Sequence, residues 1–151
     1  MTEDILASLT LTPADVPNLP AKARSSLIAY LLRWEHYDIA RRCLQQLLIT
    51  NSQMLSVYDD MARAYLGLDQ PEKALEILRR RQTLTISSLS QTLEAEARLA
   101  AGDLDGAQTI ANELTEKRPY LLTGWNLKID TCLAAGDLDG AEAALQRRAM
   151  S

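Results

Sequence analysis

Leu-rich stretches alternate with short polar turns along most of the chain. Each stretch has the apolar spacing and length of a helix, and each turn contains residues that begin or end helices, such as Gly, Pro or Asp. The pattern predicts eight helices, at about residues 21–33, 38–50, 54–67, 71–82, 88–101, 104–117, 121–135 and 138–149.

An internal repeat groups these helices into pairs. The nine residues Leu99–Ala107 recur unchanged as Leu133–Ala141, at an offset of 34 residues. Each repeat is predicted to be a helix, a turn and a second helix, with a small residue where the two helices approach closely. The register carried backwards gives four alanines spaced 34, 33 and 34 residues apart, namely Ala40, Ala74, Ala107 and Ala141.

The turns carry residues suited to helix ends. Gly102 and Gly136 follow apolar helical runs and fit the left-handed position that ends a helix. Asp103 and Asp137 come next and are expected to cap the following helix. Pro71 fits the first turn of a helix, where its missing N–H costs nothing.

The repeat divides the chain into a lead-in of residues 1–20 and a domain of residues 21–151. In the lead-in, Ile5, Leu6 and Leu9 favour a short apolar helix that docks on the first hairpin as an N-terminal cap. A mobile tail with incidental leucines is the alternative. The domain contains four repeats, at about residues 21–53, 54–87, 88–120 and 121–151.

Composition agrees with a helical fold. The 151 residues include no Phe, two Trp and five Tyr, and Leu and Ala supply most of the hydrophobicity. Leu and Ala favour helices, whereas the β-branched and aromatic residues of strands are scarce. The sequence therefore predicts an all-α protein.

Charge and targeting signals exclude several classes of partner. The net charge is -4, which argues against nucleic acid, because phosphate binding needs clustered excess Lys and Arg. The acidic N-terminus lacks the features of a signal peptide, and the longest apolar stretch, Leu27–Leu32, is far too short to span a membrane. We expect a cytoplasmic protein in which Cys43 and Cys132 are reduced core thiols.

The repeat resembles the tetratricopeptide repeat (TPR) family. The second unit carries the resemblance best, and the departures are Arg98 and Cys132 at a place where the family often has Tyr, and Glu94 and Lys128 where it has Leu. The resemblance implies a right-handed α-solenoid of antiparallel helix hairpins. The related pentatricopeptide repeats, which bind RNA, are disfavoured by the acidic charge. The family pattern is matched in the second unit by Tyr58, Met61, Ala62, Tyr65, Ala74 and Leu78.

The resemblance also implies a protein-binding groove lined by the first helix of each hairpin. This lining is mixed and slightly acidic, and it lacks the paired cations of the family's chaperone-tail clamp, which we therefore exclude. The implied groove residues are Lys22, Ser25, Ala29, Asp59, Arg63, Thr92, Glu96, Asn126 and Asp130.

No motif predicts catalysis, a metal or a cofactor. The single histidine, His36, lies in a turn beside Trp34 and Tyr37, where a solvated or packed side chain is expected. The two Asp-Leu-Asp-Gly segments run directly into helices, so they are interpreted as caps rather than as a calcium loop. The arginine clusters, including Arg79–Arg81, are interpreted as a solvated outer surface.

The last repeat ends without a polar capping helix, so part of its apolar face is expected to be open. Three explanations compete: the chain is the front of a longer protein, it associates with a second copy, or another protein covers this end. The leading hypothesis is a non-catalytic module that binds a protein or peptide as an adaptor, scaffold or chaperone. The alternative is an assembly or regulatory module, with a terminal interface formed by Leu138, Ala141, Ala144, Leu145 and Met150.

Overall fold

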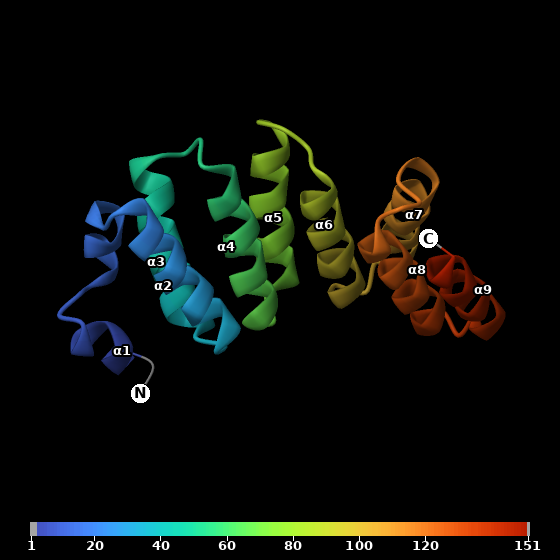
Figure 1. Cartoon of the computed structure of the whole chain (residues 1–151), viewed down its shortest axis with the longest axis horizontal. Coiled ribbons are helices and arrows are strands. Elements are labelled where there is room, and N and C mark those ends of the chain that lie inside the picture. Colours follow the sequence, from blue (N-terminus) through green and yellow to red (C-terminus); the bar gives the residue numbers. More distant parts are fainter. Residues whose placement is uncertain (1–2, 151) are drawn as a thin grey trace. The chain divides into compact units, whose positions relative to one another are not determined.

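The computed structural model describes residues 3–150, and all regular secondary structure in this range is helical (Figure 1). Two short elements precede the repeats, and eight α-helices follow. The elements are α1 (Glu3–Ser8), the 3₁₀ helix η1 (Pro13–Asn18), α2 (Ala21–Arg33), α3 (Tyr37–Thr50), α4 (Leu55–Gly67), α5 (Pro71–Gln82), α6 (Ser88–Ala100), α7 (Leu104–Lys117), α8 (Leu122–Ala134) and α9 (Leu138–Ala149).

The helices form two compact units, Met1–Leu84 and Thr85–Ser151. The first contains α1, η1 and the hairpins α2–α3 and α4–α5, and the second contains the hairpins α6–α7 and α8–α9. Within each unit the hairpins pack through consecutive helices, α3 on α4 and α7 on α8. The predicted all-α fold class of stacked antiparallel hairpins is therefore confirmed in each unit.

The eight repeat helices begin and end within one residue of their predicted limits, and four of them match at both ends. The agreement follows from turn chemistry. Gly102 and Gly136 adopt left-handed backbone conformations, with φ of 88° and 74°. The corresponding turns of the first two hairpins place Glu35 and Asp69 in the same region, with φ of 61° and 58°, although neither residue is glycine.

Both Asp-Leu-Asp-Gly segments form the predicted helix caps. The Gly106 N–H donates to Asp103 Oδ1, and the Gly140 N–H donates to Asp137 Oδ1, each at 2.9 Å. A Cβ at either glycine would run into the capping carboxylate. The repeated Gly is thus needed for the close approach that satisfies a free N–H at the start of the helix.

The lead-in adds two short helical elements, α1 and η1, to the eight helices that were expected. Leu6 of α1 and Val16 of η1 are buried in the core of the first unit, and η1 packs on α3. Ile5 is half-buried against the same core. The expectation that Leu9 also docks there is wrong, because it lies in the turn after α1 and is 53% exposed.

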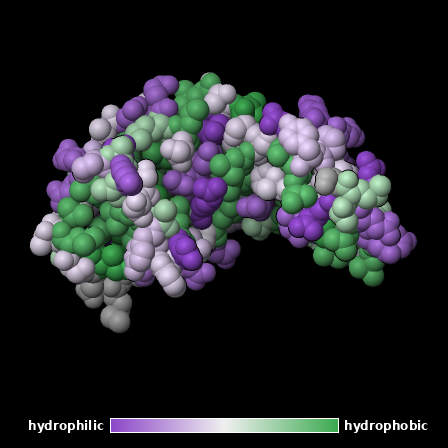
Figure 2. Space-filling view, viewed as in Figure 1, coloured by the Kyte–Doolittle hydropathy of each residue, from purple (hydrophilic) through white to green (hydrophobic). Residues whose placement is uncertain are grey.

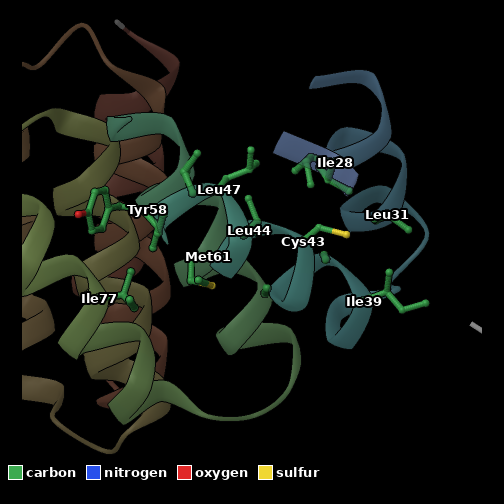
Figure 3. Packing of buried hydrophobic residues seen from close by; sticks show 14 of the residues in the cluster. Ile28, Leu31, Ile39, Cys43, Leu44, Leu47, Tyr58, Met61 and Ile77 are labelled. Carbon is green, nitrogen blue, oxygen red and sulfur yellow. The ribbon is translucent and has the colours of Figure 1, made fainter. Parts of the chain in front are cut away.

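The core of the first unit is built from side chains of successive helices that point toward one another (Figure 3). The core of the second unit is rich in alanine and includes Ala95, Ala107 and Ala111. All four alanines at the repeat position are buried, as expected for closely packed hairpins. The labelled core residues of the first unit are Ile28, Leu31, Ile39, Cys43, Leu44, Leu47, Tyr58, Met61 and Ile77.

Cys43 and Cys132 are both buried and unpaired. Burial raises the pKa of the Cys43 thiol to about 11, so this thiol stays protonated and unreactive near neutral pH. Within residues 3–150, no helix has both the length and the apolar character needed to cross a membrane.

Candidate functional site

Each unit has a pocket between the first helices of its two hairpins. In the first unit this pocket, here named the α2–α4 pocket, has a volume of about 380 Å³. Residues from α2, α3 and α4 and the residue preceding α4 form its walls and floor. They are Arg24, Ser25, Ile28, Ala29, Leu32, Leu44, Leu47, Met54, Ser56, Val57, Asp60 and Arg63.

The α2–α4 pocket has an apolar floor and small walls. Ile28, Leu47 and Val57 are buried side chains that belong to the core of the unit. Ser25 and Ala29 on α2 are exposed residues whose short side chains leave this floor accessible. A concave apolar surface with a few polar groups around it is the usual form of a binding site.

Charged side chains line the same pocket. Arg24 comes from α2, whereas Asp60 and Arg63 come from α4, where the Arg63 Nη1 lies 2.8 Å from the Asp60 Oδ1. Burial raises the pKa of Asp60, and the neighbouring Arg63 opposes this shift only in part. The pocket therefore contains two guanidinium groups and one carboxylate that is already paired.

The second unit has a smaller, acidic pocket at the equivalent place, here named the α6–α8 pocket, with a volume of about 110 Å³. All four residues predicted for the groove in this unit line it: Thr92 and Glu96 from α6, and Asn126 and Asp130 from α8. Thr123 and Leu127 complete the lining. The period of the repeat thus brings together side chains that are more than 30 residues apart in sequence.

The groove residues predicted for the first unit are only partly brought together. Ser25, Ala29 and Arg63 line the α2–α4 pocket, whereas Lys22 is exposed at the start of α2 and does not. The expectation that Asp59 lines a groove is wrong, because its side chain is buried. The neighbouring Asp60 lines the pocket instead, one residue further along α4.

Asp59 is buried because it faces α5, where it forms an ion pair with Arg81 at 2.8 Å. The interpretation of Arg79–Arg81 as a solvated cluster is therefore wrong for Arg81, whereas Arg79 and Arg80 are exposed. Arg80 lies over the ring of Tyr58, 5.8 Å from its centroid. Nothing in the spacing of the sequence distinguished Asp59 from Asp60 or Arg81 from Arg80.

The predicted terminal interface is also only partly exposed. Leu138, Leu145 and Met150 are 70%, 52% and 83% exposed. Ala141 and Ala144 were expected on the same open face, but they are buried because the small side chains allow α8 and α9 to pack closely. Hydrophobic side chains also reach the surface around the turn between α8 and α9 (Figure 2), where Leu133 is exposed.

The predicted turn histidine belongs to an exposed aromatic cluster. His36 stacks against Tyr30 at 6.2 Å between ring centroids, and the Tyr30 and Trp34 centroids are 6.4 Å apart. Tyr30 was missed by sequence reasoning, although its position one turn before Trp34 on α2 was the available signal. Among the described residues, no group of three or more His, Cys, Asp or Glu side chains is placed to hold a metal ion.

Comparison with known proteins gives no assignment. No protein-family model matches the chain, and no curated protein sequence matches it.

Proposed function

We propose that this chain is a non-catalytic, TPR-like module that binds a segment of another protein in the pockets between the first helices of its hairpins. The observation that carries the proposal is the α2–α4 pocket, in which a buried apolar floor is accessible beside charged side chains. The acidic α6–α8 pocket at the equivalent repeat position supports the same use of the scaffold. The two unpaired cysteines suit a reducing compartment, so we place this activity in the cytoplasm.

A variant that fills the pocket tests this proposal. In Ala29→Trp, an indole replaces an exposed methyl group in the pocket wall and blocks access to Ile28 and Val57. Ala23→Trp is the matched control, because Ala23 is an exposed residue of the same helix that does not line the pocket. Circular dichroism first verifies that both variants keep the helical content of the unmodified chain.

The ligands for this test are selected from a random peptide display library with the unmodified protein as bait. Fluorescence polarisation then measures how tightly each peptide binds the two variants. We expect Ala29→Trp to weaken binding by about ten-fold or more, since apolar contacts with the floor are lost, and Ala23→Trp to leave it unchanged. Failure to enrich any peptide, or equal binding to both variants, contradicts the proposal.

Self-association is a second candidate, favoured by the exposure of Leu138, Leu145 and Met150. Light scattering coupled to size-exclusion chromatography over a range of concentrations tests it. A dimer that Leu145→Glu converts to a monomer supports an assembly role. A monomer at every concentration contradicts it and leaves peptide binding as the proposed activity.

A further inference from the structure

We infer that the α2–α4 pocket selects an acidic partner: an internal peptide segment in which a large apolar side chain lies next to an Asp or Glu side chain. This inference rests on the proposed function and names the partner of that same pocket. The apolar side chain would contact the floor, and the carboxylate would bind Arg24 at the rim.

The floor accounts for the apolar part of the partner. Ile28 from α2, Leu47 from α3 and Val57 from α4 converge beneath the exposed Ser25 and Ala29. A volume of about 380 Å³ lies within the range of pockets that bind small ligands, roughly 300–1,000 Å³. A Leu or Phe side chain of a partner would therefore be removed from water against buried aliphatic groups.

The charges account for the acidic part. Two arginines and one aspartate line the pocket, giving it a net positive charge in a chain whose overall net charge is -4. Asp60 is paired with Arg63, whereas the described residues offer Arg24 no ion pair or hydrogen bond to its side chain. Its planar guanidinium is thus available for the bidentate contact that carboxylates favour.

The same arrangement disfavours a basic partner. A Lys or Arg side chain entering the pocket would approach Arg24 and Arg63, and the one carboxylate available to it, Asp60, is already paired. The α6–α8 pocket has the opposite character, because Glu96 and Asp130 line it and no basic residue does. An acidic segment therefore has an electrostatic reason to choose the α2–α4 pocket.

Three probe peptides that differ only in charge test this inference on the full chain labelled with ¹⁵N. Each is N-acetylated and C-amidated with the sequence Gly-Ser-Xaa-Leu-Leu-Xaa-Ser-Gly, where both Xaa are Glu, Gln or Lys. The blocked termini ensure that a carboxylate can come only from a side chain. We expect the Glu peptide to shift the amide signals of Ser25, Ala29 and Ser56 and to bind about ten-fold more tightly than the Lys peptide.

A charge variant with a matched control assigns the preference to Arg24. Arg24→Gln should lower the affinity for the Glu peptide several-fold and leave the affinity for the Gln peptide unchanged. Lys73→Gln removes the same charge from an exposed site on α5 outside the pocket, so it should leave the affinity for the Glu peptide nearly unchanged. Equal losses in the two variants would mean general electrostatic attraction and would overturn the inference.

The remaining outcomes separate this inference from the proposed function. Equal binding of all three peptides at Ser25 and Ala29 overturns the charge preference but supports peptide binding in the pocket. Tighter binding of the Lys peptide, or shifts confined to Thr92 and Asn126, also overturns it. If no peptide shifts either pocket, both proposals fail. If instead the Ser25 and Ala29 signals shift on dilution of the free protein, a second copy occupies the pocket, which overturns the acidic partner.

Discussion

Arg81 on α5 forms an ion pair with Asp59 on α4, with the Arg81 Nε 2.8 Å from the Asp59 Oδ1 and the side chains only 5% and 6% exposed. Burial raises the pKa of Asp59, and the charge of Arg81 lowers it only in part. The aspartate is therefore ionised at a cost that its partner offsets incompletely. Such a pair fixes how two helices meet more than it stabilises them, because desolvation opposes the attraction.

Arg81→Met should destabilise the protein by about 3–5 kcal/mol at pH 7, because it leaves the Asp59 carboxylate buried without its partner. The pKa of Asp59 is already raised and should rise further in this variant. A raised pKa in the folded state favours folding at low pH, and this contribution is lost as the pH rises through that pKa. Urea unfolding followed by circular dichroism should therefore show a smaller loss at pH 4 than at pH 7.

Two variants control for this prediction. Arg63→Met breaks the more exposed pair with Asp60, so it should cost about 1 kcal/mol or less. Asp59→Leu combined with Arg81→Met replaces the buried pair with apolar groups and should be close to neutral. Equal losses for Arg81→Met and Arg63→Met would show that the buried pair has no special role.

Glu35→Gly and Asp69→Gly should each stabilise the protein, by about 1 kcal/mol for Glu35 and less for Asp69. Both residues have a left-handed backbone, which costs non-glycine residues roughly 1–2 kcal/mol and Asp somewhat less. Thermal unfolding measures the gain. Gly102→Ala is the converse test, since no atom lies within 4 Å of the added Cβ and the backbone conformation alone should lower stability. An unchanged melting temperature in all three variants would contradict the role assigned to these turns.

The stability of the second unit should depend on the ionisation of Asp103. The Gly106 N–H and then Arg98 lower the pKa of this carboxyl below its ordinary value of 3.8. A lowered pKa contributes stability that is present above the ordinary value and is lost as the pH falls through the pKa of the folded state. Because Asn can still cap the helix, Asp103→Asn should be less stable than the unmodified chain at pH 6, with a difference that shrinks toward pH 2.

Thermal unfolding of both proteins across this pH range checks the prediction. Arg98→Met should reduce the pH dependence without abolishing it, since the Gly106 N–H makes the larger contribution to the lowered pKa. A difference in melting temperature that stays constant with pH would be inconsistent with a titrating cap.

Gly67→Ala should destabilise the first unit by about 1–2 kcal/mol, although alanine is normally the better residue in a helix. The reason is the ring of Tyr37, which packs against the Gly67 backbone and occupies the place of a side-chain methyl group. Combining Gly67→Ala with Tyr37→Leu should recover part of the loss in urea unfolding. A stabilising Gly67→Ala would mean that Tyr37 moves aside freely.

The helices and their ends could be predicted because the signals lie within a few residues of one another. Gly102 ends α6 and Asp103 begins α7 through their own backbone and hydrogen-bonding preferences, whatever the rest of the chain does. The same holds for the alanine repeat. Ala107 is buried because it lies where the hairpin closes, and the period of the sequence marks that place.

The individual site residues were harder to predict because their positions depend on helix rotation. Asp59 and Asp60 are adjacent and chemically identical, yet the first is buried against Arg81 and the second lines a pocket. Their difference is a rotation of one residue on α4, and it is settled by an arginine more than twenty residues later. Arg24 was missed for the same reason, since its part in the α2–α4 pocket follows from the position of α4 opposite α2.

The duplicated turn has a further consequence for how this chain can change in length. Leu99–Ala107 and Leu133–Ala141 share one sequence, and their turns share a left-handed glycine and an aspartate cap. A recombination event that joins one copy to the other would leave a native junction at the splice. Residues 104–137 therefore form an exchangeable cassette, and whole hairpins can be gained or lost without inventing a new turn.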